Sequence, residues 1–144
     1  MGTIKFVHEE QRAFVSVAER AKIDPVFREA LERAPGDESR SETFTHHAGS
    51  ADEPQLFEVR FPPGAAAAPH AHDTDEIIVV TAGEIRFGKQ TYGVGSSVMI
   101  PKMTLYSFQA GPEGLTFLNF RPTRSMRAIF KDEFMAMRRA AHPG

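Results

Sequence analysis

Apolar and polar positions alternate along the middle of the chain in the manner of β-strands. Between residues 56 and 61, Phe57, Val59 and Phe61 recur at every second position, so their side chains share one face of an extended segment. Residues 76–81 form a nearly continuous apolar run rich in β-branched side chains, which is typical of a strand covered on both faces. Short runs of this kind, separated by glycine and proline, indicate a β-sandwich or barrel over residues 42–121.

Glycine-containing segments mark the expected turns between these strands. Residues 82–84 predict a turn before a returning strand at 85–87, and residues 110–114 predict a hairpin between strands at 105–109 and 115–120. The pattern therefore predicts a succession of short strands joined by tight turns.

The two ends of the chain differ from the middle. Residues 1–41 are partly helical: Asp24 followed by Pro25 is typical of a helix start, because aspartate caps a helix and proline suits its first position. Residues 132–141 predict an amphipathic helix with Phe134 and Met137 on its apolar side. We therefore expect an N-terminal extension (1–41) that packs on the barrel, the barrel itself (42–121) and a C-terminal helical segment (122–144).

Composition narrows the range of partners. The 144 residues carry 17 Lys and Arg against 19 Asp and Glu, a formal charge of -2, so a nucleic-acid partner is not expected. No stretch approaches the ~20 apolar residues that cross a bilayer, and the first residues lack the apolar core of a secretion signal. The absence of cysteine excludes disulfides and thiolate ligands. We expect a cytoplasmic protein without a membrane partner.

The segment from residue 64 to 76 carries the most informative chemistry. His70, His72 and Glu76 are separated by even numbers of residues, so in an extended chain their side chains point to the same side. Two imidazoles and one carboxylate form a facial ligand set for a divalent transition metal and leave positions open for water or substrate. Geometry alone leaves a second reading open, in which the histidines are ordinary surface residues.

These residues resemble the first motif of the cupin family. The run Gly64-x5-His70-x-His72-x3-Glu76-x6-Gly83 reproduces that motif at every position, and Gly95-x5-Pro101 resembles the start of the second motif. The resemblance covers roughly residues 42–121. It implies an all-β double-stranded β-helix (a jelly-roll barrel) with short flanking helices, a metal held inside one end of the barrel, and a homodimer.

The second motif departs from the family pattern. The family's usual glycine is Met103, its asparagine is Ala110, and its final ligand histidine is Tyr106. The resemblance thus implies the ligands His70, His72 and Glu76 with a phenol in the fourth place. Tyr106 has three open roles: it coordinates the metal as a phenolate, it transfers protons beside the metal, or it only hydrogen-bonds and fills space.

The donor set suits one divalent transition metal, iron first, with manganese, nickel, zinc or copper as further options. The leading hypothesis is an enzyme that acts on a small organic molecule as a non-haem iron dioxygenase. The runner-up uses the metal as a Lewis acid in a cyclisation, isomerisation or elimination, with Tyr106 moving the proton. A third reading is a non-enzymatic ligand-binding or sensory protein, because one barrel hosts many chemistries.

Further polar residues are secondary candidates. His46 and His47 are adjacent, so one of them faces the barrel interior on a regular strand and could supply the missing imidazole. Asp73 and Asp75 flank the expected ligands. Candidate anchors for an anionic substrate are Arg86, Lys102, Gln109, Asn119 and Arg121. Candidate apolar lining residues are Phe57, Phe61, Phe87, Met99, Met103, Phe108 and Phe117, although such side chains also fill barrel interiors.

Overall fold

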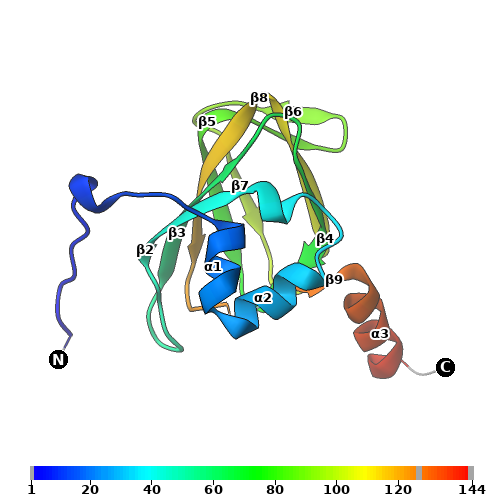
Figure 1. The fold of residues 1–144 in the computed structure, drawn as a ribbon. Coiled ribbons are helices and arrows are strands. Elements are labelled where there is room, and N and C mark those ends of the chain that lie inside the picture. The colour runs from blue at the N-terminus through cyan, green and yellow to red at the C-terminus, as the bar shows by residue number, and fades with distance from the viewer. Residues whose placement is uncertain (1, 126–127, 143–144) are drawn as a thin grey trace.

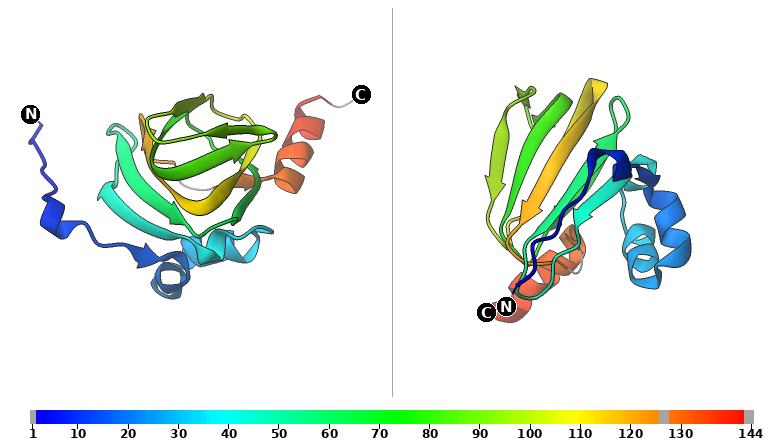
Figure 2. Two further views of the ribbon diagram at one scale, coloured as in Figure 1. Left: turned by 90° about the horizontal axis from the view of Figure 1, so that it is seen from above. Right: turned by 90° about the vertical axis from the view of Figure 1, so that its left-hand side faces the viewer.

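The fold is a curled antiparallel sheet that closes into a barrel, with three helices outside it (Figures 1 and 2). The structure, a computed structural model, describes residues 2–125 and 128–142, without the side chains of Val26, Phe27 and Ala30. In chain order the strands are β1 (Val15–Ser16), β2 (Glu42–His47), β3 (Gln55–Phe61), β4 (Ala66–Ala71), β5 (Glu76–Phe87), β6 (Gln90–Tyr92), β7 (Ser97–Ile100), β8 (Tyr106–Arg121) and β9 (Ile129–Phe130). The helices are α1 (Val17–Ile23), α2 (Pro25–Glu32) and α3 (Lys131–Ala141), with short 3-10 helices at Glu9–Gln11 and Glu38–Arg40.

β8 is the strand that closes the barrel. It pairs antiparallel with β3, β4 and β5, and β5 in turn pairs with β6 and β7. The core lies between these strands, where Phe61, Ile78, Val80, Ile85 and Phe117 are almost completely buried. The alternation around Phe57, Val59 and Phe61 is confirmed, because these side chains turn toward the barrel interior.

Long bent strands replace two of the predicted turns. β5 runs through residues 82–84 and β8 runs through residues 110–114, so the expected turn and the expected hairpin are both wrong. Gly83 and Gly114 have positive φ angles of 69° and 92°, and a Cβ atom on Gly83 would collide with the carbonyl of Gly114. The pairing of β5 with β8 changes register on either side of Gly83. These glycines therefore mark bulges where two strands bend and approach each other, and only glycine tolerates that geometry.

Residues 15–41 lie against the barrel, whereas the chain before them extends away from it (Figure 1). β1 pairs with β2, and Val17 and Ala21 of α1 are buried. The side chain of Asp37 accepts a hydrogen bond from the amide of Ala66 on β4 at 2.9 Å. α2 begins at Pro25, as predicted from the sequence. The two helices lie together beside the barrel, as Figure 1 shows.

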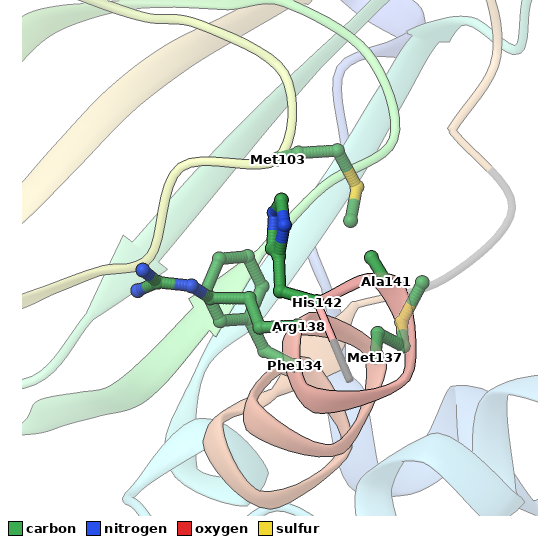
Figure 3. A pocket seen from close by; sticks show the side chains of 6 residues that line it. All are labelled: Met103, Phe134, Met137, Arg138, Ala141 and His142. Atoms are coloured by element: carbon green, nitrogen blue, oxygen red, sulfur yellow. The ribbon is translucent and has the colours of Figure 1, made fainter. Parts of the chain in front are cut away.

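α3 follows β9 directly and lies outside the barrel. Its predicted range is confirmed to within one residue, and Phe134 is buried against Ala71, Ile129 and Leu105. Met137 is more exposed than predicted, at 41%. It lines a surface pocket between α3 and the loop before β8 (Figure 3), together with Met103, Phe134, Arg138, Ala141 and His142. In the described part of the chain, no helix is long and apolar enough to span a membrane.

Candidate active site

The predicted site residues converge at one end of the barrel. His70 lies on β4 directly opposite Tyr106 at the start of β8, and their ring centroids are 4.5 Å apart. Glu76 is the first residue of β5 and its side chain is 1% exposed, while His72 follows β4 by one residue. His72 Nε2 and Glu76 Oε2 are 3.9 Å apart. The even spacing in the sequence therefore corresponds to a real cluster.

His70, His72 and Tyr106 of this cluster line a cavity of about 380 Å³. Its polar lining includes His70, His72, Tyr106, Asn119 and Arg121, together with Thr43, Thr45 and Gln55 of β2 and β3. The apolar lining includes Phe57, Val59, Phe61, Ala67, Phe108, Phe117 and Phe130, and α1 and α2 contribute Val17 and Leu31. Such a volume suits a small organic molecule with an apolar body and a polar end.

Arg121, one of several anion anchors proposed from the sequence, is the central cation of the cluster. Its Nε atom donates to Glu76 Oε2 at 3.0 Å, and a terminal nitrogen lies 3.1 Å from His72 Nε2. Its other terminal nitrogen donates to Gln55 Oε1 at 3.0 Å, and the guanidinium lies 4.9 Å from the ring centroid of Phe57. The side chain is 9% exposed, so the guanidinium and the Glu76 carboxylate form a buried ion pair.

Tyr106 completes the environment of the carboxylate. Its hydroxyl donates a short hydrogen bond to Glu76 Oε1. Burial, the nearby Glu76 charge and this bond raise the pKa of Tyr106 well above 10, so the side chain remains a phenol at neutral pH. Both carboxylate oxygens of Glu76 therefore have a donor, one from Tyr106 and one from Arg121.

Both histidines are oriented through their Nδ1 atoms. His70 Nδ1 lies 2.7 Å from the carbonyl oxygen of Ala68; because a carbonyl only accepts, Nδ1 carries the proton and Nε2 holds the lone pair. Burial lowers the pKa of His70, which keeps the ring neutral near pH 7. His72 Nδ1 lies 3.2 Å from the hydroxyl of Ser125, which donates to Asp73 at 3.0 Å.

Arg121 already bonds the carboxylate and imidazole atoms that a metal ion would need as ligands. Within residues 2–125 and 128–142, no three His, Asp or Glu side chains are grouped so that they could hold a metal ion. Glu76 Oε2 and His72 Nε2 both bond to the guanidinium instead. As placed, the donor residues do not fit a metal centre, because a cation that already neutralises the carboxylate lies between them.

Several residues proposed from the sequence lie elsewhere. His46 bonds Glu58 on the face of β3 opposite Phe57, and the register shift between Thr45 and His47 pairs His47 with Leu56. Neither histidine lines the cavity: alternation with Thr45 turns His46 to the other face, and the bulge after Thr45 keeps His47 from the inward position that a regular strand would give it. Residues that point away from the cavity or are exposed are Asp75, Arg86, Met99, Lys102 and Gln109.

Two further residues, Gln55 and Ser125, contribute to the site although the sequence does not predict them. Gln55 reaches the site because it is the β3 partner of Arg121, and Ser125 reaches it from beyond the predicted barrel. No local motif marks either residue.

Asn119 is one of the anion anchors that the sequence predicts. It is 3% exposed and lines the cavity, and its Oδ1 has no hydrogen-bond partner among the described residues.

Comparison with solved structures identifies the fold as that of the cupins. The chain is similar to the polyketide cyclase RemF from Streptomyces resistomycificus over 94% of both chains, with a TM-score of 0.62 and 19% identity. It is similar to Rru_A2000 from Rhodospirillum rubrum, a cupin-2 domain, over 74% of this chain and 75% of that one (TM-score 0.54, 19% identity). It also matches an acetylacetone dioxygenase from Acinetobacter johnsonii over 67% and 74% of the two chains (TM-score 0.51, 14% identity).

No family model and no curated protein matches the sequence. The expected jelly-roll barrel of the cupins is confirmed by these structures. At 13–20% identity the likeness establishes the fold, and it leaves the reaction to be argued from the site.

Proposed function

We propose that the protein is an enzyme that transfers a proton within a small carbonyl compound, as an isomerase, cyclase or lyase does, without net oxidation. One observation carries this proposal: a neutral imidazole, a phenol and a guanidinium line one cavity together with several aromatic side chains. Acid–base enzymes place a base and hydrogen-bond donors around one substrate position in this way.

His70 is the proposed base. Its Nδ1–H is held by the Ala68 carbonyl, which leaves Nε2 to accept a proton from a C–H next to a carbonyl group. Removing that proton breaks the C–H bond, forms an Nε2–H bond that makes His70 an imidazolium, and leaves the electron pair in a substrate enolate. The same proton then returns to another carbon of the enolate, which restores the neutral imidazole. No oxidant is consumed, and the sum of the two transfers is an isomerisation.

Arg121 and Tyr106 are the proposed partners of the enolate oxygen. The guanidinium has five N–H groups, and three of its bonds go to Glu76, His72 and Gln55, which leaves donors for a ligand. The Tyr106 hydroxyl supplies a further donor when it gives up its hydrogen bond to Glu76 and donates to the substrate oxygen instead. A positive charge in a buried site stabilises a developing oxyanion far more than the same charge in water does.

The cavity wall supports a substrate with an apolar, partly aromatic body. Phe57, Phe108 and Phe117 supply aromatic surface, and the free Oδ1 of Asn119 suits a hydroxyl or amide donor on the ligand. A hydroxylated aromatic or polyketide-like ketone combines these features. RemF, a solved structure of similar fold, is named a polyketide cyclase, and this likeness supports the proposal.

The experiment is hydrogen exchange in D₂O. Purified protein is incubated with a panel of 1,3-diketones and aryl ketones, and loss of the α-proton signal is followed by NMR. We expect α-proton exchange with the wild type. The exchange rate should fall at least 100-fold in His70→Gln, because this substitution removes the base while it keeps much of the side-chain volume. His47→Gln is the matched control, since His47 does not line the cavity.

A second candidate is the metal-dependent dioxygenase expected from the sequence, with His70, His72 and Glu76 as ligands and Tyr106 beside them. The observation that favours it is the anchoring of both imidazoles through Nδ1, which is how metal-binding histidines are commonly held. It requires Arg121 to leave its present place. Iron-dependent oxygen consumption with a diketone substrate would select this candidate over proton transfer.

A further inference from the structure

We infer that Arg121 is a built-in cation that replaces a metal ion in this barrel, and that it keeps His70, His72 and Glu76 from binding one. The three side chains are of the right chemical types for a divalent metal. What differs from a metal centre is the guanidinium between them, which lies 3.0 Å from Glu76 Oε2 and 3.1 Å from His72 Nε2.

Charge balance supports this assignment. The Glu76 side chain is 1% exposed, and a buried carboxylate needs a positive partner to remain ionised. Arg121 is the side chain that provides it, from a position that is itself 9% exposed. His72 serves the guanidinium as an acceptor through Nε2, the same lone pair that a metal would take.

Several contacts hold the guanidinium in place. Gln55 Oε1 accepts from one terminal nitrogen at 3.0 Å, and the ring of Phe57 lies against the planar group at 4.9 Å. A metal ion that enters must break the bonds from Arg121 to Glu76 and His72 and move a buried charge past Phe57. Competition of this kind lowers the apparent metal affinity, because a metal ion binds only the small fraction of molecules in which the resident Arg121–Glu76 pair is open.

The inference is tested by metal titration of the full chain. Ni²⁺ and Zn²⁺ are added separately to the metal-free wild type, to Arg121→Met and to Arg121→Gln, with binding followed by calorimetry and by the melting temperature. We expect the variants to bind one ion per chain at least 100-fold more tightly than the wild type. We also expect the ion to raise the melting temperature of the variants, because it restores the missing positive charge.

Two controls define the site. Arg124→Met removes another cation that lines the cavity, and it should leave the weak metal binding of the wild type unchanged. His70→Ala added to Arg121→Gln should abolish the gained binding. If Arg121→Met does not fold alone, refolding with and without Ni²⁺ provides the same comparison.

The inference is overturned if the wild type binds one ion as tightly as the Arg121 variants, or if neither variant gains binding. Neither result depends on turnover. Failure of the proton-exchange experiment therefore leaves this inference standing, and its own failure leaves the exchange experiment to be judged separately.

Discussion

The buried pair between Arg121 and Glu76 gives the most quantitative prediction. Replacing Arg121 with methionine keeps much of the side-chain volume but removes the hydrogen bonds to Glu76, His72 and Gln55. The carboxylate, 1% exposed, then has no positive partner and retains the Tyr106 hydroxyl as its donor. Removing one member of a buried ion pair costs about 3–5 kcal/mol, because the remaining charge stays buried.

The expected cost corresponds to a large thermal shift. For a chain of this size 1 kcal/mol lowers the melting temperature by roughly 2–4 °C, so a cost of about 3–5 kcal/mol should make Arg121→Met melt roughly 6–20 °C below the wild type. Far-UV circular dichroism is the suitable probe, because the chain has no tryptophan. Urea denaturation of the same proteins supplies the free energies of unfolding.

A double-mutant cycle separates the pair from its surroundings. Glu76→Gln keeps an acceptor for Tyr106 but removes the charge, so in its presence Arg121→Met should cost at least about 1.5 kcal/mol less than it costs alone. Arg60→Met is the matched control: it breaks a pair with Glu42 whose members are 46% and 41% exposed, and it should cost about 1 kcal/mol or less. The reasoning is refuted if Arg121→Met costs no more than Arg60→Met.

Three further predictions test other parts of the account. Tyr106→Phe should retain the fold, with a cost of about 1–3 kcal/mol for the lost hydrogen bond, and lose at least 100-fold of any exchange activity; unchanged activity would exclude a role for the hydroxyl. Arg12 lowers the pKa of the buried Glu58 carboxyl below 4.5, so the pair stabilises the fold above this pH and the stabilisation is lost as the pH falls through the folded-state pKa. In urea titrations, the difference in unfolding free energy between the wild type and Glu58→Gln should be about 1 kcal/mol at pH 7 and should shrink below pH 4.5. A difference that stays constant with pH would contradict this assignment. Gly83→Ala should lower the free energy of unfolding by about 2–5 kcal/mol, because the new Cβ requires a positive φ and collides with the carbonyl of Gly114. Gly88 also has a positive φ but has open space around it, so Gly88→Ala should cost about 1–2 kcal/mol. Equal costs would show that the close approach at Gly83 is unimportant.

Local periodicity explains what could be predicted of the site. His70, His72 and Glu76 lie within seven residues, and an extended chain with period two brings their side chains to one side. Tyr106 followed from its place in the second motif, and the structure pairs it directly with His70. These residues come together because neighbouring strand positions determine their direction.

The remaining contacts depend on strand register and on bulges, which the sequence does not display. Arg121 reaches Glu76 across 45 positions of the chain, and Gln55 reaches Arg121 through the pairing of β3 with β8. His47 lies outside the cavity because a bulge interrupts β2 after Thr45. Glycine at a turn and glycine at a bulge have the same local signal, so the sequence predicts turns at residues 82–84 and 110–114, where the structure has bent strands.

The most direct test of the site is a crystal structure of the wild-type protein grown with Ni²⁺, with diffraction recorded on both sides of the nickel absorption edge. The account predicts the Arg121 guanidinium between Glu76 and His72 and no anomalous signal in the barrel. A nickel ion bound by His70, His72 and Glu76, with Arg121 turned away from them, would contradict it.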